Sequence, residues 1–215
     1  MFKILPLNIA LFIYFAALLV MTMALPPETT NRMFSEDGVF ETGSVLLWIG
    51  MSVALAYTRT YWDIKIWLSL TSLSLFAAMR ELDFQKAFTT EGFMKINYYY
   101  NPGIPFVEKM IAGSVFAVIL IIAIYSVCRA VRFIRKGGFR TLRGVLLLEI
   151  VPLLVITKIC DRLPGTLKSD FDYSMSDQLS AITLAIEEGG EMIIPLLCII
   201  AIISKKRELV ITRQS

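Results

Sequence analysis

Ala185-Ile186-Glu187-Glu188-Gly189-Gly190-Glu191-Met192 is the stretch on which the organisation of this chain depends. It places three carboxylates inside a run of about 27 residues, 178–204, that is otherwise apolar enough to cross a bilayer. An ionised side chain in the hydrocarbon region of a membrane is strongly unfavourable unless it faces a cavity or a partner. An acidic cluster at this depth therefore predicts a functional site.

The composition of the whole chain indicates a polytopic membrane protein. Hydrophobic residues make up 56% of the 215 residues and the mean hydropathy is +0.67, above the values of an ordinary soluble domain. One transmembrane helix takes roughly 20 residues, so the chain has room for about six such helices and none for a separate soluble domain. We expect one all-α domain over residues 1–215, a bundle of six transmembrane helices with the lipid bilayer as its main partner. The predicted spans are 4–25, 40–58, 64–81, 106–128, 144–162 and 178–204.

Basic loops set the orientation of these spans. Segment 129–143 carries six basic residues and no acid, which is typical of a cytoplasmic loop. The acidic segments 26–43 and 163–177 then lie outside, and both termini lie in the cytoplasm. This pattern predicts an integral protein of a bacterial inner (plasma) membrane.

Two segments near the N-terminus leave alternatives open. The apolar run 4–25 is longer than the usual hydrophobic region of a signal peptide and ends in a weak cleavage site, so a retained span is favoured over a cleaved signal. The second and third runs are short enough to form one re-entrant hairpin, although that arrangement leaves Arg59 and Lys65 within the membrane.

Segment 84–100 mixes phenylalanines with charged residues and ends in Tyr98-Tyr99-Tyr100. Such a pattern predicts an amphipathic helix at the outer membrane surface, with the tyrosines in the aromatic belt.

The chain contains no histidine, and its three cysteines lie in or at the end of apolar runs without metal-binding spacing. We therefore expect buried free thiols rather than a disulfide or a zinc site. Any chemistry must depend on carboxylates, Lys, Arg, Tyr, Ser and Thr. The net charge of +3 lies in particular loops, so it predicts topology and no nucleic-acid partner.

With this topology, three charged clusters from distant parts of the sequence lie in the outer half of the membrane. Along a helix, residues three or four positions apart share a face, so Glu191 shares a face with both Glu187 and Glu188. Lys158 and Arg162 are also four positions apart, and their edge of the fifth span can face the acids of the sixth. The three clusters are Arg80, Glu81 and Asp83 after the third span; Lys158, Asp161 and Arg162 after the fifth; and Glu187, Glu188 and Glu191 in the sixth.

These clusters hold six acids and three bases. Uncompensated carboxylates in a low dielectric either bind cations or take up protons. With oxygen ligands alone, a bound metal would be Mg²⁺, Ca²⁺ or Mn²⁺ rather than zinc. Gly189 and Gly190 weaken the helix and allow the close approach of a neighbouring helix or a ligand, and Pro195 predicts a kink.

The chemistry that best fits these clusters is that of a metal-assisted, membrane-embedded hydrolase or transferase, acting on a lipid or lipid-linked substrate from the outer leaflet. The predicted roles are Glu187, Glu191, Asp161 and Asp83 as metal ligands, Glu188 and Glu81 as catalytic acid or base, and Arg80, Lys158 and Arg162 as substrate-binding groups.

Three other interpretations stay open. A cation- or proton-coupled transporter or channel would use 187–191 as a broken helix at mid-membrane. A non-catalytic membrane subunit or assembly factor would use the charges to hold a partner helix. A purely structural network would join the glutamates to Lys158 and Arg80 without any chemistry.

Overall fold

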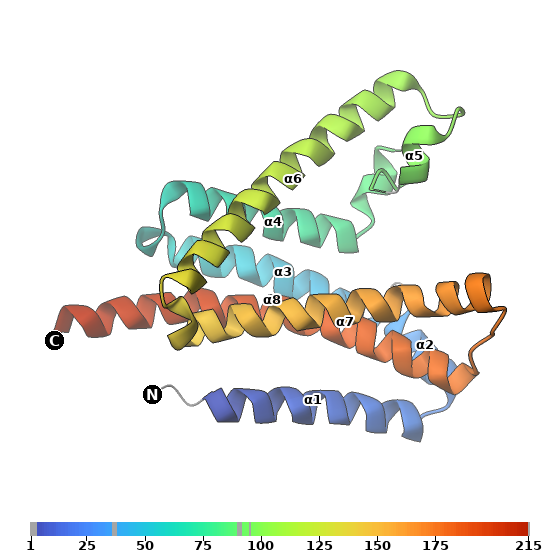
Figure 1. Cartoon of the computed structure of the whole chain (residues 1–215), viewed down its shortest axis with the longest axis horizontal. Helices are drawn as coiled ribbons and strands as arrows, with labels where there is room; N and C mark the ends of the chain where they lie inside the picture. Colours follow the sequence, from blue (N-terminus) through green and yellow to red (C-terminus); the bar gives the residue numbers. More distant parts are fainter. Residues whose placement is uncertain (1–3, 36–37, 90–91, 95, 215) are drawn as a thin grey trace.

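The computed structural model describes residues 4–35, 38–89, 92–94 and 96–214. This part of the chain is almost entirely helical and contains no strand, which confirms the predicted all-α class (Figure 1). The helices are α1 (Ile4–Ala24), α2 (Pro27–Phe34), α3 (Val39–Tyr57), α4 (Ile64–Glu81), α5 (Ile96–Tyr100), α6 (Phe106–Arg135), α7 (Leu142–Phe171) and α8 (Asp177–Gln214), with 3-10 turns η1 (Arg59–Tyr61), η2 (Phe84–Ala87) and η3 (Gly138–Arg140).

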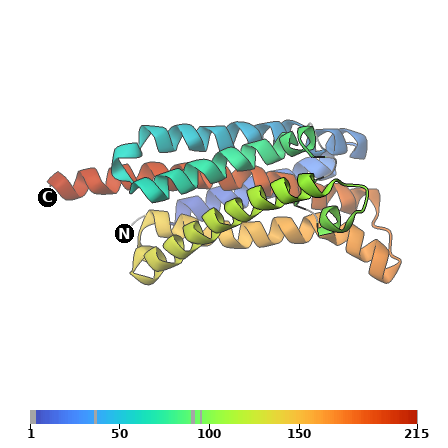
Figure 2. The same cartoon turned by 90° about the horizontal axis from the view of Figure 1, so that it is seen from above.

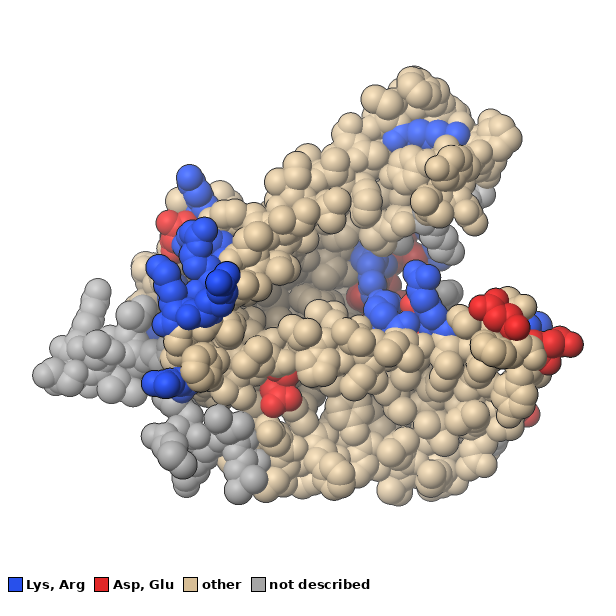
Figure 3. Space-filling model, in the orientation of Figure 1, with Lys and Arg blue, Asp and Glu red and all other residues tan. Residues whose placement is uncertain are grey.

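The six long helices alternate in direction. Figures 1 and 2 show α1, α4 and α7 running away from the end where both termini lie, and α3, α6 and α8 running back towards it. Lys and Arg side chains gather at that end of the molecule (Figure 3). Up-and-down packing therefore places the basic loops and both termini at the same end.

Three segments of the described chain are long and apolar enough to cross a membrane: Pro6–Ala24, Glu28–Tyr57, which contains α2 and α3, and Phe106–Arg135. The other long helices, α4, α7 and α8, have 18, 30 and 38 residues. They carry the charged residues of the predicted site, and this lowers their apolar character.

Helices α3 and α4 form an antiparallel pair rather than a short hairpin. Their 19 and 18 residues correspond to about 29 and 27 Å at 1.5 Å per residue, close to the thickness of a hydrocarbon core. Ser52 and Ser74 share a hydrogen bond of 2.6 Å, and the indole N–H of Trp67 donates to the carbonyl of Leu55 at 3.0 Å. The carboxylate of Asp63 caps the start of α4 by accepting from the N–H of Lys65.

Helix α7 continues past the predicted end of the fifth span at residue 162 and ends at Phe171. The predicted outer loop 163–177 is therefore wrong for most of its length, and the connection to α8 is only 172–176. Loss of apolar character set the predicted boundary, but a polar sequence can continue a helix beyond the apolar region. Asp172 ends α7 in the left-handed conformation, with φ 49°, which Asp tolerates better than most residues.

The single interfacial helix predicted over 84–100 is also wrong where the chain is described. The structure has the short turn η2, an irregular segment and the five-residue α5, and residues 90, 91 and 95 lie outside the described part. Thr89 and Gly92 favour interruption because both have low helix propensity.

The end of this segment packs inward instead of lying on the membrane surface. Tyr98 is fully buried with Phe93, Ile104 and Ala112. Its hydroxyl donates to Glu108 at the start of α6, with an O···O distance of 3.0 Å. Burial, and then the hydrogen bond to Glu108, raise the pKa of Tyr98 to about 12. The predicted aromatic-belt position therefore does not hold for Tyr98.

Helix α8 lies at the centre of the bundle. It packs against α7, α3, α1 and α2, while α4 packs on α3 and α6 packs on α4 (Figure 1). Towards the end near the termini, α7 and α8 share a core that contains Leu146, Ile150, Leu153, Ile193 and Leu197. Figure 1 shows that α6 diverges from α7 towards the opposite end, where α5 lies.

Candidate functional site

The double glycine lets two helices approach α8 closely at the acidic stretch. A Cβ atom at Gly189 would lie 2.3 Å from Cδ1 of Leu18 in α1, and one at Gly190 would lie 2.4 Å from Cγ2 of Thr157 in α7. The hydroxyl of Tyr14 also donates to the carbonyl of Gly189 at 2.8 Å. The helix remains continuous through this region from residue 177 to residue 214. The broken helix predicted for a transporter is therefore wrong, and the close approach is made by neighbouring helices.

Glu191 joins three helices through its carboxylate. One oxygen accepts from Arg80 of α4 and the other lies against Lys158 of α7, each at 2.9 Å. The Glu191 side chain is only 14% exposed, whereas those of Arg80 and Lys158 are 34% and 47% exposed. Two charge-assisted contacts to a largely buried carboxylate fix the relative positions of α4, α7 and α8.

Both basic residues extend this bridge to a second acid. Arg80 also binds Glu81 at 2.7 Å, and Lys158 also binds Asp161 at 3.3 Å. The result is a continuous chain of five charged groups, with Glu191 at its centre. This network contains three acids and two bases, and of the three glutamates of α8 only Glu191 belongs to it.

Glu187 and Glu188 lie beside this network and point to different neighbours. Successive residues of a helix are separated by about 100°, and the electrostatic contacts of the two carboxylates differ accordingly. Glu187 interacts with Asp161 and Lys158 of α7 and with Arg80 of α4, whereas Glu188 interacts with Glu81 of α4 and Glu41 of α3. Both side chains are half-buried, and neither forms a hydrogen bond or an ion pair with the described residues.

Glu41 is a member of the cluster that the sequence reasoning did not select. It lies in the first turn of α3 and interacts electrostatically with both Glu81 and Glu188. Glu41 lies where the predicted outer loop 26–43 overlaps the predicted span 40–58, and it is not among the predicted site residues. The apolar run that begins directly after Glu41 indicates that this acid lies at the start of a long apolar helix, next to the other charged helix ends.

A small cavity of about 190 Å³ opens beside these acids, where the start of α3 and the end of α4 meet. Its lining residues are Glu41, Thr42, Val45, Leu46, Glu81, Leu82 and Asp83.

Besides Glu187 and Glu188, two further predicted site residues, Asp83 and Arg162, lie outside the network. Asp83 pairs with Lys86 in the turn after α4. Arg162 is exposed and forms no hydrogen bond or ion pair within the described part of the chain.

The predicted metal ligands Glu187, Glu191, Asp161 and Asp83 do not form one compact group. No three or more Asp, Glu or Cys side chains in the described ranges gather as a metal site would require. Both oxygens of Glu191 are engaged by cations, and Asp161 is engaged by Lys158. A cation held by these four residues would therefore require the present ion pairs to rearrange.

A hollow between α6 and α7 makes part of the cluster accessible. The space-filling view shows basic and acidic atoms exposed within it, away from the basic end of the molecule (Figure 3). The partial exposure of Arg80 and Lys158 agrees with access from this side. The arrangement can attract an anionic group and present carboxylates to it.

No protein family model matches this chain, and comparisons with curated proteins and with solved structures find no significant match.

Proposed function

We propose that this chain is an integral membrane enzyme, a hydrolase or transferase that acts on an amphiphilic, lipid or lipid-linked substrate. The observation that carries the proposal is the pair of half-buried carboxylates, Glu187 and Glu188, next to the Arg80–Glu191–Lys158 bridge. Carboxylates at such a depth are costly, and their retention next to exposed cations is the usual sign of a functional site.

The proposed membrane arrangement has six spans, α1, α3, α4, α6, α7 and α8. The alternating directions of these helices, with both termini and the basic loops at one end, support it. In this orientation the termini are cytoplasmic, the protein lies in a bacterial inner membrane, and the acidic cluster faces the outer half of the bilayer.

The proposed chemistry is acid–base catalysis by Glu188, which lies among carboxylates and has no ion pair within the described residues. Arg80 and Lys158 attract the anionic group of the substrate, with Glu191 holding both in place. Arg162 is a further candidate for this anionic group. The catalytic role predicted for Glu81 is proposed less strongly, because its carboxylate is already bound to Arg80.

Assistance by a divalent cation remains part of the proposal. Glu187 and Asp161, which interact electrostatically, offer oxygen ligands of the kind that Mg²⁺, Ca²⁺ or Mn²⁺ prefers, provided that Asp161 exchanges its contact with Lys158 for the ion. The ion would polarise a phosphoryl or carbonyl oxygen of the substrate.

Transport is supported less well than catalysis. Helix α8 is continuous at the site, and the core of α7 and α8 towards the terminal end consists of apolar side chains such as Ile150 and Leu197. These apolar residues provide no polar path for an ion through the half of the bundle near the termini.

The test is turnover by purified protein in proteoliposomes made from the total polar lipids of the expressing cells, with added Mg²⁺ or with a chelator. Mass spectrometry of lipids and released soluble products should detect conversion by the wild type. Glu188→Gln should reduce the rate by about 10²-fold or more, as expected for the loss of a general acid or base. Glu28→Gln, which changes an exposed acid of α2, is the matched control.

Equal turnover by the wild type and Glu188→Gln, or no conversion by the wild type, would overturn the proposal. Thermal unfolding of each variant should show that loss of turnover does not reflect loss of folding.

A further inference from the structure

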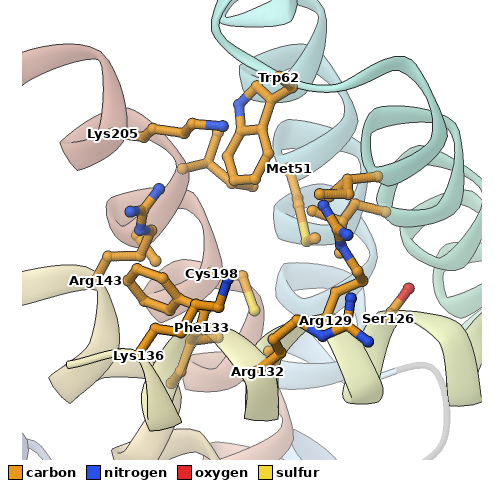
Figure 4. A pocket seen from close by; sticks show the side chains of 16 residues that line it. Met51, Trp62, Ser126, Arg129, Arg132, Phe133, Lys136, Arg143, Cys198 and Lys205 are labelled. Atoms are coloured by element: carbon orange, nitrogen blue, oxygen red, sulfur yellow. The ribbon is translucent and has the colours of Figure 1, made fainter. Parts of the chain in front are cut away.

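A second cavity lies at the opposite end of the bundle from the acidic cluster. Its volume is about 460 Å³, within the range of roughly 300–1,000 Å³ that is usual for small-molecule sites. It lies between α3, α4, α6, α7 and α8, close to the basic loop 129–143 (Figure 4).

The interior of this cavity is apolar. Its walls include Met51 of α3, Leu70 of α4, Leu147 of α7 and Ile202 of α8. Such a lining accommodates hydrocarbon rather than a fully charged solute.

The edge of the same cavity is strongly basic. Five basic side chains line it, and the lining contains no acid among the described residues: Arg129, Arg132, Lys136, Arg143 and Lys205. Four of them belong to the basic segment 129–143, and the tertiary fold brings the fifth, Lys205 of α8, beside them (Figure 4).

Two of these cations are held over aromatic rings. The ammonium of Lys205 lies 3.7 Å from the ring centre of Trp62, and the guanidinium of Arg143 lies 4.3 Å from that of Phe133. Cation–π contacts of this kind position the charged groups at the edge of the cavity. The arrangement is more specific than a set of basic side chains that extend independently to the lipid headgroups.

We infer that this cavity binds an anionic phospholipid from the cytoplasmic leaflet. The phosphate lies among Arg129, Arg132 and Lys136, and one acyl chain enters the apolar interior. The charge of the edge selects an anionic headgroup, the interior selects a hydrocarbon chain, and the inner end of the bundle is where such lipids lie. The inference uses the proposed membrane orientation but is independent of catalysis at the acidic cluster.

The test compares retention of phosphatidylglycerol and phosphatidylcholine by the purified full chain, using native mass spectrometry from detergent. The wild type should retain phosphatidylglycerol at least about fivefold better. Arg129→Gln with Arg132→Gln should lower that retention about tenfold or more, because each basic residue near a headgroup contributes about one kcal/mol. Arg135→Gln with Arg140→Gln makes the same change of charge in the same loop, outside the cavity lining, and should have little effect.

A third variant tests the interior separately from the charge. Ala130→Trp adds volume to the cavity lining while keeping every basic residue, and it should also reduce retention of phosphatidylglycerol. Unchanged retention in this variant would overturn the inference, because binding would then need only the charged edge.

Three other results would also overturn it. These are equal retention of the two lipids, equal losses in the two double variants, and binding of inorganic phosphate as tight as that of phosphatidylglycerol. The last result would assign the site to a free anion. If cysteine labelling places the basic end of the bundle outside the cell while the lipid is still retained, the assignment to the cytoplasmic leaflet is overturned and the lipid site itself stands.

Discussion

At the scale of single residues, the two ends of the acidic stretch have different roles. Glu191 balances Arg80 and Lys158, whereas Glu187 and Glu188 form no ion pair with the described residues. Spacing along the helix predicted that Glu191 would share a face with its neighbours, but not which glutamate would receive the cations. The positions of α4 and α7 relative to α8 decide this, and Gly190 allows the close approach of α7.

Replacing Glu191 with Gln should lower the free energy of unfolding by about 1–3 kcal/mol, because two cations lose a largely buried anionic partner. Thermal unfolding in detergent, followed by circular dichroism, measures the effect. Glu28→Gln, at an exposed position, should change stability by less than about 0.5 kcal/mol. Equal effects of the two changes would contradict the bridging role of Glu191.

At the scale of elements, the interfaces of α8 depend on residues without side chains. Gly190 faces a threonine of α7, and a Cβ atom there would overlap the stiff, branched side chain of Thr157. Gly189 faces the flexible end of Leu18, which can move more easily. The sequence indicated a close approach at this pair but could not identify the partner helices.

Gly190→Ala should destabilise the protein by about 1–3 kcal/mol through overpacking, although alanine has the better helix propensity. Gly165→Ala is the matched control within α7, since nothing lies near its added methyl group, and it should be neutral or stabilising. Adding Thr157→Ser should restore stability to Gly190→Ala by removing the overlapping methyl group. Thermal unfolding of all three variants measures this, and a failure of the rescue would argue against the predicted overlap.

A part-buried hydrogen bond from Tyr98 to Glu108 connects α5 with α6. Tyr98→Phe should cost about 1–2 kcal/mol, whereas Tyr100→Phe, at a side chain that is 78% exposed, should cost little.

The same hydrogen bond predicts a pH dependence. The pKa of Tyr98 is raised from 10.0 to about 12 in the folded protein, so an unfolded chain loses this proton first. The stabilisation is therefore fully present below about pH 10 and is lost as the pH rises towards 12. The free energy of unfolding, measured at steps of about one pH unit from about pH 9 to about pH 12, should decrease less for Tyr98→Phe than for the wild type. Identical pH profiles of the two proteins would contradict this.

At the scale of the whole molecule, the two ends of the bundle differ in charge. One end holds the basic loops, both termini and the apolar cavity, and the other half holds the acidic cluster. This polarity follows from the alternating directions of the six long helices. It is the feature by which the proposed membrane orientation can be tested.

We expect opposite accessibility of Ser174→Cys, in the loop between α7 and α8, and Arg140→Cys, in η3. Both are exposed positions, placed in a chain whose three native cysteines are changed to alanine. A membrane-impermeant maleimide should label Ser174→Cys in intact cells and should label Arg140→Cys only after the membrane is permeabilised. Labelling of both in intact cells would contradict the six-span arrangement.

The sequence alone determined the all-α class, the approximate starts of the long helices and the unusual acidic stretch, because these depend on local composition and on the cost of charge in an apolar run. It failed at 163–177 and 84–100, where loss of apolar character was interpreted as the end of a helix or a surface location. Only the tertiary structure decided that Glu191 receives both cations, that Glu41 joins the cluster and that Lys205 joins the basic residues of segment 129–143 around one cavity. These features depend on the rotation and separation of packed helices. A spacing of three or four residues shows which side chains share a face of one helix, but it does not show which other helix that face contacts.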